Sequence, residues 1–176
     1  MQEKCNNIVL IGPMGSGKTT VGRRLAENLK ISFFDADHEI IDKTGVSIDH
    51  IFDVEGEEGF RKRESDVLED LCSKPNIVLA TGGGAVLSKE NREVIKKTGT
   101  VIYLSSSVEQ ILRRTAKSKT RPLLENSTNR RKTISDIIDS RDPLYREVAS
   151  VIINTNGKKL IEIINEIKTH LPNLFI

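Results

Sequence analysis

The sequence has no tryptophan, only seven aromatic residues and only two cysteines, Cys5 and Cys72. Two cysteines cannot build a disulfide framework, and they are more simply explained as free thiols in a reducing compartment. No apolar run approaches the roughly 20 residues that a membrane span needs, and the N-terminal stretch lacks the apolar region of a signal peptide. These absences exclude membrane, small secreted and fibrous classes, and we expect a cytoplasmic protein.

The chain also lacks an excess of charge of either sign. Lys and Arg number 27 and Asp and Glu number 25, which gives a formal net charge of +2. This balance gives no reason to expect nucleic acid or an anionic membrane as a partner. The 176 residues, of which 37% are hydrophobic, are enough for one globular domain with a substantial core.

Five short runs rich in Val, Ile or Phe alternate with stretches of helical periodicity, at residues 7–11, 31–34, 76–80, 100–104 and 150–154. Most of the runs are continuously apolar, which is typical of strands that are buried on both faces of a parallel sheet. Strand and helix alternate along the chain, so each strand is joined to the next by a crossover helix. The pattern predicts an α/β three-layer sandwich, with a central parallel sheet of about five strands, in a single domain over residues 1–176.

The first run leads into Gly12-Pro13-Met14-Gly15-Ser16-Gly17-Lys18-Thr19, which fits the phosphate-binding pattern G-x-x-x-x-G-K-[ST]. The glycines let backbone N–H groups converge on phosphate oxygens, and the following helix adds the partial positive charge of its N-terminus. Lys18 is expected to reach the β- and γ-phosphates, and the Thr19 hydroxyl to hold Mg²⁺. The motif therefore indicates a nucleoside triphosphate without showing how it is used.

Three uses of that nucleotide compete: a small-molecule kinase, a GTPase switch and a nucleic-acid motor. No Asn-Lys pair occurs in the chain, so the usual signature for guanine is missing. A motor normally needs a larger chain or a ring, and base-stacking platforms are scarce when only seven residues are aromatic. These observations favour the kinase.

Two aspartates, Asp35 and Asp37, follow the second predicted strand. If the segment is extended, residues two apart face the same side, and the carboxyl end of a strand is where α/β proteins bind ligands. One carboxylate can serve Mg²⁺ and its waters, and the other can accept a hydrogen bond or a proton from a substrate hydroxyl. The alternative is that Asp37 caps a helix over residues 38–43, but capping explains only one aspartate.

Two further features are ambiguous on their own. Arg61 and Glu64 share one face of a charged helix, and the spacing alone favours a solvated surface pair. Gly82, Gly83 and Gly84 follow the third strand, where they could form a flexible turn or let the backbone approach a ligand. Their position at the carboxyl end of a strand favours a site.

Residues 113–132 contain eight basic residues and one acidic residue. We interpret this segment as a lid over the triphosphate, because an arginine that closes on the γ-phosphate stabilises the transferring group.

Asp142 and Pro143 then predict the start of a short helix, with Asp142 as its N-cap. The three histidines and both cysteines lack metal-ligand spacing, so we expect no metal held by protein side chains alone.

Taken together, these segments resemble the shikimate kinase family. The resemblance is collinear over nearly the whole chain and includes GPMGSGKTTVGR at 12–23, FDAD at 34–37, GEEGFR at 56–61 with Glu64, TGGG at 81–84, RPLL at 121–124 and RDPLYREVA at 141–149. It implies a P-loop kinase fold, with a substrate-binding helical segment at about 37–72 and the lid at about 113–132. It also implies ATP-dependent phosphorylation of the 3-hydroxyl of shikimate, a step of chorismate and aromatic amino-acid biosynthesis.

The resemblance also implies roles for individual residues. Asp37, Lys18 and Arg121 would be catalytic, with Asp37 the candidate base and Arg121 the lid arginine. Thr19 would contact Mg²⁺ directly and Asp35 through water. ATP would be bound by Gly12, Met14, Gly15, Ser16, Gly17, Lys18, Thr19, Thr20, Arg114 and Arg121, with Arg114 beside the adenine. Shikimate would be bound by Asp37, Arg61, Gly82, Gly83, Gly84 and Arg141, with Glu64 orienting Arg61.

The alternatives are another P-loop small-molecule kinase, acting on gluconate or a nucleoside monophosphate, and a non-catalytic binding module gated by nucleotide. We expect ATP and a small-molecule substrate as partners, with no nucleic acid and no membrane, and a monomer.

Overall fold

The computed structural model describes residues 6–116, 124 and 128–171. In this part of the chain five parallel strands form one sheet in the order β2-β3-β1-β4-β5. The strands are β1 (Asn7–Ile11), β2 (Ser32–Asp35), β3 (Ile77–Ala80), β4 (Gly99–Ser105) and β5 (Val151–Asn154). Each predicted run overlaps one strand, so the predicted fold class is confirmed.

The centre of the sheet is β1, which pairs with β3 on one side and β4 on the other. Val9 lies opposite Leu79 and Val101 in this register. The chain leaves β1 toward the edge strand β2, whereas it leaves β4 toward the opposite edge strand β5. The two connections diverge at the carboxyl ends of the central strands, which is where open α/β sheets bind ligands.

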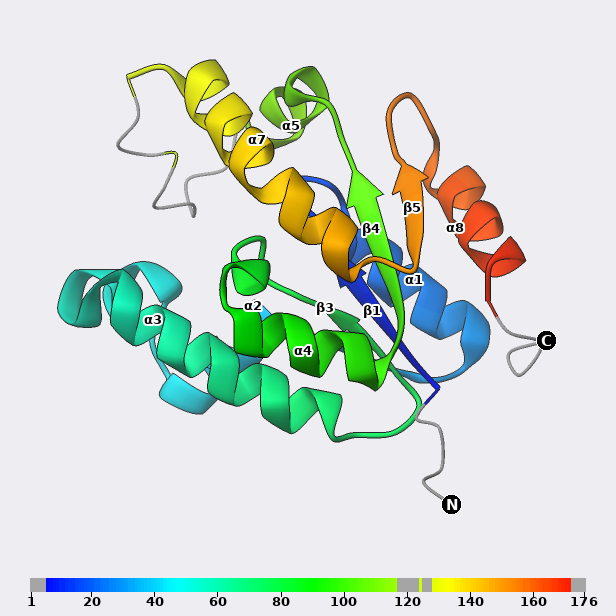
Figure 1. Cartoon of the computed structure of the whole chain (residues 1–176), viewed down its shortest axis with the longest axis horizontal. Coiled ribbons are helices and arrows are strands. Elements are labelled where there is room, and N and C mark those ends of the chain that lie inside the picture. The colour runs from blue at the N-terminus through cyan, green and yellow to red at the C-terminus, as the bar shows by residue number, and fades with distance from the viewer. Residues whose placement is uncertain (1–5, 117–123, 125–127, 172–176) are drawn as a thin grey trace.

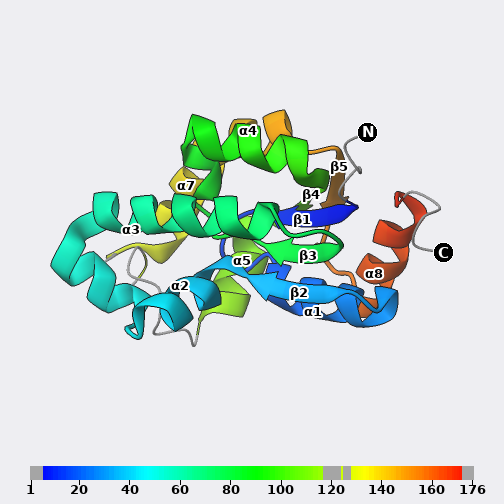
Figure 2. The same cartoon turned by 90° about the horizontal axis from the view of Figure 1, so that it is seen from below.

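Helices cover both faces of the sheet (Figures 1 and 2). On one face, α1 (Lys18–Leu29) and α8 (Leu160–Thr169) pack on alternate strand residues such as Ile8 and Leu10. On the other face, Val9 and Ile11 pack in a cluster with residues of α3 (Ile48–Cys72), α4 (Lys89–Thr98) and α7 (Arg130–Val148). Successive side chains of a strand point to opposite faces, so the four consecutive apolar residues of β1, at positions 8–11, serve both layers.

The shorter elements position the site. Helix α2 (Ala36–Thr44) follows β2 directly, and α3 bends at Gly56, whose φ of 70° is non-helical. A short 3-10 helix, η1 (Ala85–Leu87), follows β3, and α5 (Val108–Thr115) follows β4. In the described residues, none of the helices combines the length and the apolar character that crossing a membrane requires.

The expectation of a new short helix at Asp142 is wrong, because α7 runs without a break through Pro143. Proline lacks an N–H, so the helix loses one internal hydrogen bond there, but the surrounding turns continue. Asp142 does not cap a helix. Its carboxylate accepts hydrogen bonds from the Tyr103 hydroxyl at 2.8 Å and from Nε of Arg146 at 2.6 Å.

Candidate active site

A cavity of about 530 Å³ opens at the carboxyl ends of the strands. It brings together all the predicted site residues that the structure describes except Gly12, which is not part of its lining. Its walls come from the phosphate loop, the start of α2, α3, the glycines after β3, α5, α7 and the loop before α8. The predicted residues in its lining are Met14, Gly15, Ser16, Gly17, Lys18, Thr19, Thr20, Asp35, Asp37, Arg61, Gly82, Gly83, Gly84, Arg114 and Arg141.

The phosphate loop is held in a conformation that needs glycine. The φ angle of Gly12 is 145°, and a Cβ atom there would lie 2.6 Å from the carbonyl oxygen of Leu104. Gly17, with a φ of 96°, is the N-cap of α1 and has no side chain to cover the first N–H groups of the helix. Lys18 is buried, and its Nζ donates to the carbonyls of Gly12 at 2.7 Å and Pro13 at 2.9 Å. The loop therefore presents backbone donors and one buried ammonium group, which suits a phosphate chain.

Asp35 joins three elements at the edge of this loop. Its Oδ2 accepts a hydrogen bond from the Thr19 hydroxyl at 2.6 Å. Its Oδ1 accepts from the backbone N–H groups of Asp37 at 3.0 Å and His38 at 3.3 Å, so Asp35 is the N-cap of α2. The alternative reading of Asp37 as a helix cap is therefore wrong. The cap is Asp35, because β2 ends at Asp35 and the helix already begins at Ala36.

Asp37 lies in the first turn of α2, so the extended geometry used to place it beside Asp35 is also wrong. Both aspartates still line the cavity. A Cβ atom on Gly82 would lie 3.1 Å from Oδ1 of Asp37 and 2.5 Å from Oε1 of Glu64. The two carboxylates therefore approach Gly82 closely, and the absence of a side chain at Gly82 makes room for them.

Arg61 and Glu64 do not form a solvated surface pair, which corrects the expectation from their spacing. Only 1% of the Glu64 side chain is exposed, and it accepts a 2.7 Å bond from Nη1 of Arg61. Burial raises the pKa of Glu64, and the charge of Asp37 adds to the rise, whereas Arg61 and Arg141 oppose it. Glu64 Oε1 and Arg61 Nε are buried and have no hydrogen-bond partner among the described residues.

The remaining glycines of the loop after β3 lie against two arginines. A Cβ atom on Gly84 would lie 2.4 Å from Nη1 of Arg61, and one on Gly83 would lie 3.7 Å from Nη1 of the buried Arg141. The Gly83 carbonyl accepts a 2.5 Å hydrogen bond from the Tyr145 hydroxyl. Two guanidinium groups thus lie against this glycine loop. The loop also lies beside the phosphate loop, because the same Cβ atom on Gly83 would lie 3.2 Å from the backbone nitrogen of Met14.

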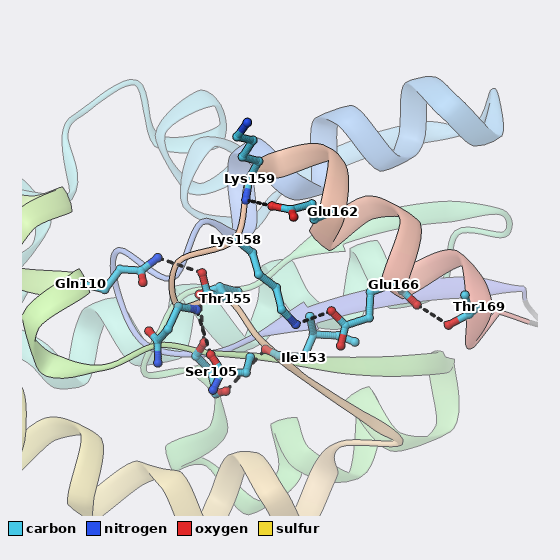
Figure 3. A network of polar contacts seen from close by, with 11 residues as sticks. Ser105, Gln110, Ile153, Thr155, Lys158, Lys159, Glu162, Glu166 and Thr169 are labelled. Carbon is cyan, nitrogen blue, oxygen red and sulfur yellow. Dashed lines mark hydrogen bonds and ion pairs between the residues drawn. The ribbon is translucent and has the colours of Figure 1, made fainter.

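The opposite end of the cavity is bounded by α5 and the loop between β5 and α8. Arg114 donates to the carbonyl of Gly15 at 3.0 Å, and burial lowers its pKa. The side-chain amide of Gln110 donates to the carbonyl of Thr155 at 3.0 Å (Figure 3). Its amide oxygen accepts from the N–H of Gly157 at 3.3 Å.

Lys158, in the loop that Gln110 fixes, lines the cavity and forms an ion pair with Glu166 (Figure 3). Sequence reasoning missed both Gln110 and Lys158. The available signal is that Gln110 lies one helical turn before Arg114 on α5. That spacing identifies one shared helix face, but it does not identify the distant loop that the face touches.

Arg121 and the central part of the predicted lid lie outside the described residues. Helices α5 and α7, which flank that segment, are described and pack on each other through residues such as Ile111 and Ile134. In the described part of the chain, His, Cys, Asp and Glu form no cluster of three or more that could hold a metal ion.

Comparisons with known proteins agree with this geometry. A family model described as shikimate kinase matches residues 14–172. The chain is 48% identical over 176 residues to a shikimate kinase of Histophilus somni, with complete coverage of both chains. It is 49% identical over 165 residues to a shikimate kinase of Thioalkalivibrio sulfidiphilus, covering 94% of this chain and 86% of the relative. A solved structure of shikimate kinase from Acinetobacter baumannii in complex with shikimate has a TM-score of 0.92 and 50% identity, covering 96% of this chain and 93% of that one. The chain belongs to the shikimate kinase family.

Proposed function

We propose that the protein transfers the γ-phosphoryl group of ATP to the 3-hydroxyl of shikimate, which gives shikimate 3-phosphate and ADP. Family membership supports the reaction, and one observation in the cavity carries the choice of substrate. Arg61 and Arg141 lie against the glycine loop, in the same cavity as the phosphate loop. An anionic substrate that presents a carboxylate to these arginines can place a hydroxyl near a bound triphosphate.

The substrate carboxylate would be bound by the guanidinium groups of Arg61 and Arg141. A guanidinium fork matches a planar carboxylate with two parallel hydrogen bonds, which an ammonium group cannot do. Glu64 accepts from Nη1 of Arg61 at 2.7 Å and so limits the rotation of that fork.

Asp37 would accept the proton of the 3-hydroxyl or hold that hydroxyl in line with the γ-phosphate. Its position in the first turn of α2, close to Gly82, supports either role. Lys18 would stabilise the charge on the transferring phosphoryl group, and Arg121 in the lid would add a second positive charge. Loose phosphoryl-transfer transition states need positioning and charge stabilisation more than covalent help.

The oxygens of Thr19 and Asp35 fit a hard divalent cation. The hydroxyl and the carboxylate oxygen are already 2.6 Å apart, and Mg²⁺ prefers such oxygen donors together with waters and phosphates. We propose Thr19 as a direct ligand and Asp35 as a partner through water. The chemistry that Mg²⁺ supplies there is neutralisation of phosphate charge.

We also propose that the protein acts as a cytoplasmic monomer without nucleic acid, and that residues 113–132 close as a lid.

The reaction can be tested by incubating the protein with ATP, Mg²⁺ and shikimate and locating the phosphate on the product by NMR. We expect ADP and shikimate 3-phosphate in equal amounts. A product phosphorylated at another hydroxyl, or ADP release that does not depend on shikimate, would contradict the proposal.

A further inference from the structure

Tyr145 links the helix that carries Arg141 to the glycine loop. It lies one turn after Arg141 on α7, so the two side chains share a helix face. Tyr145 is 1% exposed, and its hydroxyl donates a 2.5 Å hydrogen bond to the carbonyl of Gly83. The loop after β3 is thereby fixed to α7 at a defined distance.

The loop after β3 also determines where the guanidinium of Arg61 lies. A side chain on Gly84 would collide with the guanidinium of Arg61, and Gly83 lies beside Nη1 of Arg141. The glycine backbone is thus in close contact with both arginines. A shift of the Gly83 carbonyl away from α7 would change the separation of the two cations.

The phenol is well placed to hold this distance. Its ring lies 4.9 Å from the ring of Tyr103, which rises from the buried strand β4 and donates its own hydroxyl to Asp142 at 2.8 Å. Burial raises the pKa of Tyr145 to about 12, against the opposing charge of Arg141 and a hydrogen bond between the side chains of Arg141 and Tyr145. The hydroxyl therefore stays protonated, and remains a donor, throughout the pH range of any practical assay.

We propose that Tyr145 is a positioning residue for the substrate carboxylate, because its hydrogen bond to Gly83 fixes the separation of Arg61 and Arg141. The inference rests on the proposed function, in which these two arginines bind that carboxylate. A purely structural role, in which the bond only stabilises the fold, is the alternative that an experiment must exclude.

The first test compares Tyr145→Phe with Tyr103→Phe. Each variant removes one hydroxyl from the same pair of contacting rings, but of the two tyrosines only Tyr145 donates to the glycine loop. We expect Tyr145→Phe to raise KM for shikimate about 5- to 20-fold, the loss expected from one well-formed hydrogen bond, with KM for ATP within about twofold. Tyr103→Phe should leave both constants near wild type. An unchanged KM for shikimate, or an equal rise for ATP, would overturn the proposal.

A change of ligand isolates the carboxylate. Affinity for shikimate and for its methyl ester, which lacks the negative charge, is measured calorimetrically with wild type and with Tyr145→Phe. The variant should lose much more affinity for shikimate than for the ester. Equal losses for both ligands would mean that Tyr145 does not act through the two arginines. Failure of the wild-type protein to bind or phosphorylate shikimate would instead refute the proposed function, so the two failures are distinguishable.

A second measurement needs no substitution at Tyr145. The chain contains only two tyrosines, so protein labelled with 3-fluorotyrosine should give two fluorine resonances, and Tyr103→Phe assigns them. We expect shikimate to shift the Tyr145 signal, and the methyl ester to shift it much less. A Tyr145 signal that is insensitive to shikimate, or equally sensitive to both ligands, would contradict the proposal even if Tyr145→Phe did not fold.

Discussion

The Thr19 hydroxyl donates a 2.6 Å hydrogen bond to Oδ2 of Asp35, so the start of α1 is joined to the end of β2. The other carboxylate oxygen of Asp35 caps α2 through the N–H groups of Asp37 and His38. One side chain thus fixes the first turn of α2, which carries Asp37, relative to the phosphate loop. The Thr19 hydroxyl and Oδ2 of Asp35 also form the proposed magnesium site.

Asp35→Asn should weaken the use of Mg²⁺ without unfolding α2. Asparagine caps a helix about as well as aspartate, but it loses the negative charge. We expect the Mg²⁺ concentration for half-maximal turnover to rise on the order of 10-fold, as for other residues that act on a metal through an intervening group. Turnover against free Mg²⁺ at fixed ATP measures this, and Asp42→Asn, at an exposed position of α2, is the matched control. An unchanged magnesium dependence would remove Asp35 from the site.

Arg61→Lys should weaken shikimate binding far more than ATP binding. Lysine keeps the charge but loses the planar fork that contacts Glu64 and, in our proposal, the carboxylate. Separate titrations of the two ligands measure the effect. Arg63→Lys, which alters an exposed arginine paired with Glu55 on the same helix, should change neither affinity. Equal losses for both ligands in Arg61→Lys would argue for a general disturbance of α3.

Asp37→Asn separates a base from a positioning group. Asparagine keeps an acceptor oxygen but cannot take a proton at neutral pH. If Asp37 is the base, kcat should fall on the order of 10²-fold or more, with KM for shikimate much less affected. If it only positions the hydroxyl, KM should rise and kcat should fall modestly. We expect the first result from steady-state kinetics, with melting curves as the control for folding. Near wild-type values of both constants would exclude both roles.

The raised pKa of Glu64 predicts two pH dependences of opposite sign. As pH falls toward that pKa, Glu64 becomes neutral before ordinary glutamates do, and Arg61 loses its charged partner. The KM for shikimate should therefore rise as pH falls through the raised pKa of Glu64, and Glu64→Gln should abolish this rise.

The contribution of Glu64 to stability behaves in the other direction. Its folded pKa lies above its unfolded value, so this contribution is complete below the unfolded pKa and is lost as pH rises through the folded pKa. The melting temperature of Glu64→Gln should consequently improve relative to wild type as pH increases. If the melting temperature of Glu64→Gln instead falls relative to wild type as pH increases, the ion pair of Glu64 with Arg61 outweighs the cost of burying the charge.

Gln110→Ala should raise KM for ATP and leave KM for shikimate unchanged. The Gln110 amide binds Thr155 and Gly157 and so holds the loop that carries Lys158 against the end of the cavity beside Arg114. Loss of both hydrogen bonds should raise KM for ATP roughly 10-fold. Glu109→Ala, on an exposed neighbour in α5, provides the control. A change in KM for shikimate alone would place this loop elsewhere in the reaction.

The strands and the phosphate loop could be predicted because their signals are local. Buried parallel strands such as β3 are continuously apolar, and the glycine pattern at 12–19 specifies a turn by itself. The helical placement of Asp37 could not be predicted from the two-residue spacing, since β2 ends at Asp35. The burial of Glu64 depends on Gly82, and the role of Gln110 depends on Thr155, so both are fixed by residues distant in sequence.

The central claim, that the cavity is a shikimate-specific kinase site, is most directly tested by ADP release measured across alternative acceptors. The assay compares shikimate, quinate, gluconate and nucleoside monophosphates at equal concentration, with Lys18→Met as the inactive control, because methionine fills the buried stem without the charge. We predict strong ADP release with shikimate only, reduced on the order of 10²-fold or more in the variant. Comparable release with gluconate or a nucleotide, or release unaffected by Lys18→Met, would contradict the account.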